Sequence, residues 1–157
     1  MRLLSLDVGD RRIGVALSGP NGLIATPLTW FPRAGKKRDV AYIVQLANHH
    51  GADGVVVGLP LTMAGEVGPQ AKRVLSFAEA LKEGSKLAVE MWDERLSTVE
   101  AQHLMRQAGR QPSREKGNLD AAAAAVILQS YLDAKRSPPS PPPAPPEPSP
   151  KSEAGSL

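Results

Sequence analysis

The chain has 157 residues, a length that suits one globular domain and leaves little room for two. Apolar residues make up 41% of it, enough for a single core, and the lack of cysteine excludes disulfides, zinc–thiolate sites and cysteine nucleophiles. The net charge of +3 is only a mild indication of a polyanionic partner. Asp7 interrupts the first apolar run too early for a signal peptide, and no stretch is long and apolar enough to span a membrane, so we expect no membrane partner.

Three strands are predicted at the start of the chain. Residues 3–8 form an apolar run, and the turn at 9–12 separates it from residues 13–17, where apolar and small residues alternate. This pattern predicts two paired strands. Residues 23–30 predict a third strand, which Pro27 confines to an edge or a bulge of the sheet.

Helices and strands alternate after the third strand. Apolar residues at helical spacing predict a helix that includes 40–47 and stops at Gly51, and a second helix that opens with Pro69 and ends at Gly84. Short apolar runs at 55–57 and 87–91 predict the fourth and fifth strands.

Two further helices and a tail complete the chain. Ser97, with Glu100 at capping-box spacing, predicts a helix that stops at Gly109, and the last helix is predicted over 118–134. Residues 137–157 are rich in proline, which predicts a disordered tail outside the core. The sequence therefore predicts an α/β domain over residues 1–136, with helices packed on a mixed five-stranded sheet.

Acidic residues stand at the ends of the predicted elements. Asp7 lies near the end of the first strand, Glu94 follows the fifth strand with Asp93 beside it, and Asp120 is expected in the first turn of the last helix. The first and fifth strands can end at the same edge of the sheet, and the last helix can bring Asp120 over them. The three residues proposed as catalytic are therefore Asp7, Glu94 and Asp120.

A cluster of carboxylates favours a bound metal ion. Neighbouring carboxylates repel each other in a low-dielectric site, and a hard divalent cation removes that repulsion. Ligands that are all oxygen favour Mg²⁺ or Mn²⁺. Such a site suits hydrolysis of a phosphodiester bond, so Asp7, Glu94 and Asp120 are also the expected metal ligands, with Asp93 as an alternative.

Small and basic residues surround the acids. Gly9 and Gly14 are predicted to let a phosphate backbone approach closely, and the alanine run 121–125 is predicted to let the last helix lie tightly on the sheet. Arg95 is expected to bind a phosphate or to brace one of the acids.

Basic residues also gather in three clusters that suit contacts with phosphates, although any one cluster taken alone is better explained as a solvated surface. The clusters are Arg11 and Arg12; Arg33, Lys36, Lys37 and Arg38; and Arg106, Arg110, Arg114 and Lys116. The residues predicted to bind nucleic acid are Arg11, Arg12, Arg95, Lys36, Lys37 and Arg38.

Each acid also has a purely structural interpretation. Asp7 can cap the turn after the first strand, and Glu94 can pair with Arg95 at the surface. Asp120 can stabilise the N-terminus of the last helix, with Asn118 as its cap. The joint occurrence of the three acids, in this order of strands and helices, favours a shared site.

Four motifs resemble one known family. Residues 6–16 (LDVGDRRIGVA), 57–61 (VGLPL, with Gly65), 93–98 (DERLST) and Leu119-Asp120 with the alanines after it resemble, in this order, the YqgF/RuvX family of Holliday junction resolvases, also called pre-16S rRNA nucleases. The resemblance covers everything except the tail.

This resemblance implies an RNase H-like fold, a cytoplasmic location, and a role in maturing the 5′ end of pre-16S rRNA or in cleaving branched DNA. It matches Asp7 to the first-strand acid, Glu94 (alternatively Asp93) to the acid of the DER motif, and Asp120 to the acid of the final helix. Related resolvases carry a glutamate at the end of the fourth strand, where this chain has Gly58-Leu59-Pro60. One-metal and two-metal sites therefore both stay open, as do monomer and homodimer, and RNA and DNA.

Two other functions compete with a nuclease. The motif at 7–9, followed by Gly14, also resembles the first phosphate loop of ATP-binding phosphotransferases, but those enzymes need two such domains. A non-catalytic nucleic-acid-binding factor of ribosome assembly would keep the basic clusters without using the acids.

Overall fold

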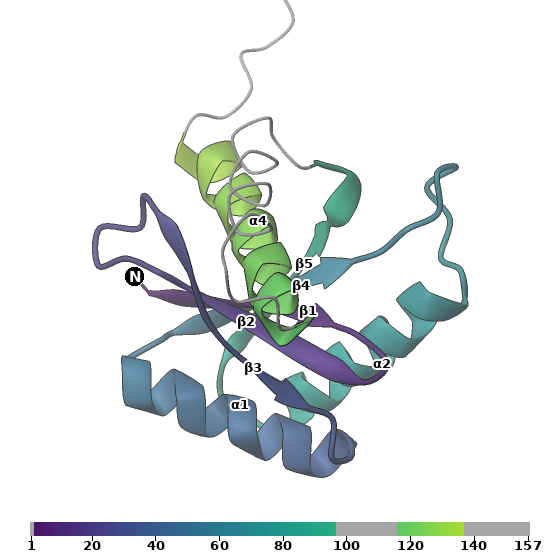
Figure 1. Ribbon diagram of the computed structural model, residues 1–157, viewed down its shortest axis with the longest axis horizontal. Helices are drawn as coiled ribbons and strands as arrows, with labels where there is room; N and C mark the ends of the chain where they lie inside the picture. The colour runs from purple at the N-terminus through teal and green to yellow at the C-terminus, as the bar shows by residue number, and fades with distance from the viewer. Residues whose placement is uncertain (1, 97–115, 137–157) are drawn as a thin grey trace, which may run out of the picture.

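The computed structural model describes residues 2–96 and 116–136, and Figure 1 shows their arrangement. Five strands form one sheet, β1 (Leu3–Val8), β2 (Arg12–Ser18), β3 (Ala25–Pro32), β4 (Gly54–Leu59) and β5 (Ala88–Asp93), in the order β3-β2-β1-β4-β5. The pairs β1–β2 and β2–β3 are antiparallel, whereas β1–β4 and β4–β5 are parallel. The predicted mixed five-stranded sheet is confirmed.

Helices cover both faces of the sheet. Helices α1 (Lys36–His50) and α2 (Pro69–Glu83) lie on one face and α4 (Lys116–Arg136) lies on the other, while the 3-10 helix η1 (Glu94–Leu96) follows β5 (Figure 1). Side chains that alternate along each strand point to opposite faces. Leu4, Leu6 and Val8 of β1 therefore join the core with α1 and α2, whereas Ser5 and Asp7 face α4.

The face under α4 is built from small residues. The strands contribute Ala16, Ala25 and Val56 to its core, and α4 contributes Ala124, Ala125, Ile127 and Leu128. The hydroxyl of Ser5 donates a hydrogen bond to the carbonyl oxygen of Ala124 at 2.6 Å. The alanines allow α4 to lie directly on the strands, as the sequence predicted.

Several predicted boundaries shift by a few residues. The third strand begins at Ala25, because a hydrogen-bonded turn from Gly19 to Ile24 takes up the expected start, and Pro27 lies on this edge strand at a register shift opposite β2. Helix α1 ends at Gly51, whose positive φ of 66° is the left-handed conformation that glycine adopts readily. The expected helix at 97–109 and the expected disordered tail at 137–157 lie outside the described residues.

The last helix begins earlier than predicted. Because α4 starts at Lys116, Asp120 is its fifth residue and lies beyond the first turn, and Asn118 lies inside the helix. The alternative that Asp120 stabilises the helix N-terminus, with Asn118 as its cap, was therefore wrong. Another explanation is needed for a carboxylate at this place.

No helix among the described residues is long and apolar enough to cross a membrane.

Candidate active site

Asp7 lies near the carboxyl end of β1, between two glycines on neighbouring strands. It pairs with Gly14 of β2, and it lies one residue beyond the Leu6–Val57 pair that joins β1 to β4, which places Gly58 on its other side. All three residues are on the face covered by α4. The two glycines leave room beside Asp7, and segments from later in the sequence fill that room.

The backbone of α4 occupies the space above Gly14. A Cβ atom at Gly14 would lie 2.0 Å from the carbonyl oxygen of Asp120 and 2.7 Å from the nitrogen of Ala121. The prediction that Gly14 lets a phosphate backbone approach was wrong, because the protein's own helix α4 covers this glycine. Gly9, given the same role, lies in the β1–β2 turn, where its Cβ would meet the Arg12 carbonyl oxygen at 2.9 Å.

The carboxyl group of Glu94 occupies the space above Gly58. A Cβ atom at Gly58 would lie 2.9 Å from Oε1 of Glu94 and 2.4 Å from Cδ1 of Ile127. The end of β4 carries no acid of its own, but its glycine makes room for an acid that follows β5. This role of Gly58 was not predicted, although a glycine that follows a valine run in a strand indicates close approach of another group.

Hydrogen bonds to α4 hold the segment that carries Glu94. The hydroxyl of Ser130, which is buried, donates to the carbonyl oxygen of Leu96 at 2.6 Å and accepts from Nε1 of Trp92 at 3.1 Å. Trp92 and Leu96 lie on either side of Glu94 in the chain. One buried serine on α4 thus fixes the end of β5 and the short helix after it.

Burial and mutual repulsion change the acidity of the two central carboxyls. Burial, and then the negative charge of Asp120, raises the pKa of Asp7 from 3.8 to about 6. Burial, and then the charges of Asp7 and Asp93, raises the pKa of Glu94 from 4.5 to about 7. Asp7 therefore interacts electrostatically with both Glu94 and Asp120, and the structure brings the three predicted acids to one end of the sheet.

Asp93 and Glu94 differ in their surroundings. Arg95 clamps Asp93 through Nε, Nη2 and its backbone N–H, at 2.7–3.1 Å, and these hydrogen bonds lower the pKa of Asp93. Of the two roles expected for Arg95, the structure shows the bracing of an acid. Arg95 pairs with Asp93, so the alternative that Glu94 is its surface partner was wrong.

The donor set has the chemistry of a site for a hard cation. Four carboxylates gather here, and the charged form of the two half-buried ones, Asp7 and Glu94, is disfavoured. A divalent cation bound to oxygen ligands is the partner that relieves this cost. Within residues 2–96 and 116–136, however, no three acidic or histidine side chains are already arranged to hold an ion. Arg12 bonds Asp120 and Arg95 bonds Asp93, so two of the four carboxylates have cationic partners.

The other predicted nucleic-acid contacts are spread around this end of the sheet. Arg11 is exposed in the β1–β2 turn, which follows the end of β1 that carries Asp7. Lys36, Lys37 and Arg38 begin α1, on the opposite face of the sheet from α4, and the structure does not bring them to the acids. Arg33 is half-buried and bonds Asp39 at 3.0 Å, so it belongs to the fold rather than to a solvated cluster.

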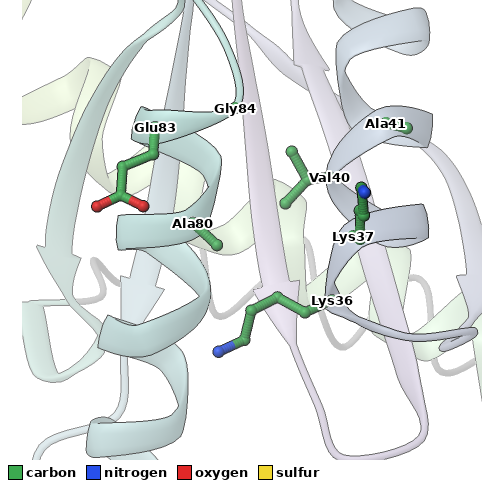
Figure 2. A pocket seen from close by; sticks show the side chains of 7 residues that line it. All are labelled: Lys36, Lys37, Val40, Ala41, Ala80, Glu83 and Gly84. Atoms are coloured by element: carbon green, nitrogen blue, oxygen red, sulfur yellow. The ribbon is translucent and has the colours of Figure 1, made fainter.

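Lys36 and Lys37 instead border a hollow of about 550 Å³ between α1 and α2. Figure 2 shows Lys36 reaching across this hollow toward α2, and its Nζ donates to the hydroxyl of Ser76 at 2.6 Å. A polynucleotide that contacts these lysines would have to pass around the end of the sheet from the acids. Arg106, Arg110 and Arg114 lie outside the described residues, as does the side chain of Lys116.

The order and directions of the five strands, with helices on both faces, define a domain of the RNase H-like class. The chain belongs to the family described as "RuvX: Holliday junction resolvase", whose model matches residues 1–134. The four sequence motifs resemble this same family, so the predicted family membership is confirmed.

Curated relatives are similar over most of their length. A protein of Chloroflexus aurantiacus named "Putative pre-16S rRNA nuclease" is 50% identical over 137 residues, which are 87% of this chain and 90% of the relative. A protein of Synechocystis with the same name is 48% identical, over 85% of this chain and 88% of the relative.

Solved structures of resolvases share the fold. Thermus thermophilus RuvC in complex with a Holliday junction substrate matches with a TM-score of 0.59 and 13% identity, over 86% of this chain and 96% of that one. Fowlpox virus resolvase with Holliday junction DNA matches with a TM-score of 0.54 and 10% identity, over 87% of this chain and all of that one. At these identities the similarity shows the RNase H-like fold alone.

Proposed function

We propose that this protein is a metal-dependent nuclease that hydrolyses phosphodiester bonds in pre-16S rRNA, in branched DNA, or in both. The observation that carries the proposal is the meeting of Asp7, Glu94 and Asp120 at one end of the sheet, from three separate parts of the chain. Family membership and the names of the relatives support a nucleic-acid substrate. We also propose a cytoplasmic location, which suits this substrate.

Asp7, Glu94 and Asp120 would hold Mg²⁺ or Mn²⁺, and Asp93 would do so only after leaving Arg95. When bound, the ion would supply an activated water and neutralise charge on the phosphate. The chain's own residues orient the reaction. The α4 backbone and β1 fix two of the carboxylates on rigid elements, Glu94 is held over Gly58, and Arg11 lies where it can contact a phosphate beside the site.

The direct test is cleavage of a labelled pre-16S rRNA fragment and of a synthetic four-way junction by one preparation. We expect Asp7→Asn to abolish cleavage, by about a thousandfold or more, while binding of the same substrates persists. Asp53→Asn is the matched control, because Asp53 directly precedes β4, at the opposite end of the strands from the acids, where its backbone N–H donates to the carbonyl oxygen of Arg2. Chelation of divalent ions should stop cleavage by the parent protein.

The competing function, a non-catalytic factor of ribosome assembly, predicts different results. Parent and Asp7→Asn proteins would then bind RNA equally and would show the same background of cleavage, with or without chelator. Such equality would overturn the nuclease proposal.

A further inference from the structure

An ion pair joins β2 to α4 beside the acids. Nε of Arg12 donates to Oδ2 of Asp120 at 2.6 Å, across 108 positions of the sequence, and the two side chains are only 32% and 25% exposed. The sequence predicts that Arg12 binds phosphate. In the structure, part of its guanidinium is bonded to one of the proposed metal ligands.

Both partners of this ion pair stand on fixed backbone. Arg12 begins β2, pairs with Pro32 of β3, and accepts a hydrogen bond from the backbone N–H of Gly9 at 2.9 Å. The backbone of Asp120 lies against Gly14, two residues further along β2. The pair is thus held by the sheet and the helix, unlike most ion pairs between exposed side chains.

The charges around Asp120 explain what such a pair does. The carboxylate of Asp120 lies in the field of Asp7, and two like charges in a partly buried site repel each other. This repulsion opposes the docking of α4 on the sheet. Arg12 brings one positive charge to the carboxylate, and a divalent ion at the acids would bring two charges to the same place.

We propose that Arg12 is a positioning residue, the built-in counterion of Asp120, which stabilises the docked α4 before a divalent ion binds and which weakens the binding of that ion. The proposal rests on the proposed function, since it takes the acids to be metal ligands. It makes Arg12 different from Arg11, its exposed neighbour, for which phosphate binding is the expected role.

Two effects of removing Arg12 oppose each other, and their sizes decide the expected result. Without the bond at Nε, the short Asp120 side chain gains some rotational freedom, which would weaken metal binding a fewfold. A positive charge a few ångströms from a divalent ion in a partly exposed site weakens binding by about tenfold. The charge effect is larger, so the loss of Arg12 should tighten metal binding.

The test uses the full chain, with Arg12→Gln, which keeps N–H donors but loses the charge, and Arg12→Lys, which keeps the charge. Mn²⁺ affinity is measured by calorimetry, and Tm is measured without metal and at saturating Mn²⁺. For Arg12→Gln we expect Mn²⁺ to bind about tenfold more tightly. Its Tm should fall by several degrees without metal and should return toward the parent value with Mn²⁺. Arg12→Lys should stay near the parent in both measurements.

Two variants make the result specific. In an Asp120→Asn background the Arg12→Gln substitution should tighten Mn²⁺ binding less than it does in the parent, because Arg12 no longer has the carboxylate that holds its charge beside the acids. Arg11→Gln should raise KM for the nucleic acid and leave Mn²⁺ affinity unchanged.

Other outcomes separate this proposal from the function it rests on. Unchanged or weaker Mn²⁺ binding by Arg12→Gln overturns the counterion role alone, provided that the parent binds Mn²⁺ and Asp7→Asn does not. If Arg12→Gln raises KM for the nucleic acid and leaves Mn²⁺ affinity and Tm unaltered, Arg12 binds phosphate and is not a counterion. If the parent binds no Mn²⁺ at all, both the counterion role and the metal-dependent function are overturned.

Discussion

On the face covered by α1 and α2, the strands present leucine, isoleucine, valine and phenylalanine, whereas on the face covered by α4 the residues around Asp7 are mainly small: Ser5, Gly14, Ala16 and Gly58, with Val56 as the larger exception. The first face buries large apolar surface and supplies much of the folding free energy. The second face buries less per residue but allows the helix backbone to approach the strands. In this domain, therefore, small residues allow the helix backbone and the carboxylates to come together, whereas large residues supply stability.

The largest loss of stability is expected on the large-residue face. Leu6 is fully buried there, and Leu6→Ala would leave a cavity that lowers the free energy of unfolding by about 2–5 kcal/mol. Denaturant unfolding measures this loss. Because Leu6 points away from α4, the protein that remains folded should keep its Mn²⁺ affinity; a matching loss of affinity would show that the two faces are not separate.

Gly14→Ala should have a smaller effect on stability and a larger one on the site. The added methyl group meets helix backbone at 2.0 Å, so α4 must move, at a cost of about 1–3 kcal/mol. We expect Mn²⁺ affinity and cleavage to be lost in protein that is still folded by circular dichroism. Gly19→Ala is the control, because its Cβ would meet its nearest neighbour at an ordinary 3.6 Å. An active Gly14→Ala protein would contradict the role given to this contact.

Gly58→Ala tests the other side of Asp7. Its Cβ would meet the flexible end of Ile127 and the carboxyl of Glu94, both of which can shift, so we expect a loss of only about 1 kcal/mol. Displacement of Glu94 should nevertheless reduce kcat by about tenfold or more. A kinetic comparison with Gly19→Ala at equal folded concentration measures this, and an unchanged kcat would show that Glu94 does not need the space above Gly58.

The raised pKa values predict how the stability of the metal-free protein depends on pH. An acid whose pKa is higher in the folded state stabilises the fold at low pH, and this stability is lost as pH rises through the folded value. Asp7 and Glu94 should therefore lower stability progressively between about pH 4 and pH 7.

Asp7→Asn removes one of these two charges. At pH 8 we expect the substitution to raise the free energy of unfolding of the metal-free protein by about 1–2 kcal/mol, since Asp7 is half-buried and solvent weakens the repulsion. At pH 3.5, where the parent carboxyl is protonated, we expect almost no change. Urea unfolding at the two pH values measures the difference. An Asp7→Asn protein that is less stable than the parent at pH 8 would show that the carboxylate has a stabilising partner.

Hydrophobic periodicity was sufficient to predict the order of the five strands and of the helices α1, α2 and α4. It also predicted that the acids meet at one end of the sheet. The apolar alternation of β1 and β2 and the valine run of β4 contain this information locally. The start of β3 shifted because the hydrogen-bonded turn from Gly19 to Ile24 is a contact that a hydrophobic pattern does not record. The start of α4 at Lys116 lies among polar residues, where hydrophobic periodicity gives no signal.

The arrangement within the site was less predictable. A glycine in a strand indicates that another group packs closely on the strand at that position. For Gly14 and Gly58, the sequence does not indicate whether this group is a ligand, a helix or a side chain. The pairing of Arg12 with Asp120 depends on how α4 docks, and the two residues are too far apart in sequence for any local signal. The metal requirement stays a prediction from the donor chemistry.

The most direct measurement of the central claim is calorimetric titration of the 157-residue chain with Mn²⁺, repeated with Asp7→Asn, Glu94→Gln and Asp120→Asn. We expect specific binding by the parent and by Asp53→Asn, and a loss of affinity of about tenfold or more in each of the three site variants. Three variants that bind Mn²⁺ as tightly as the parent would contradict the claim that these carboxylates share one ion.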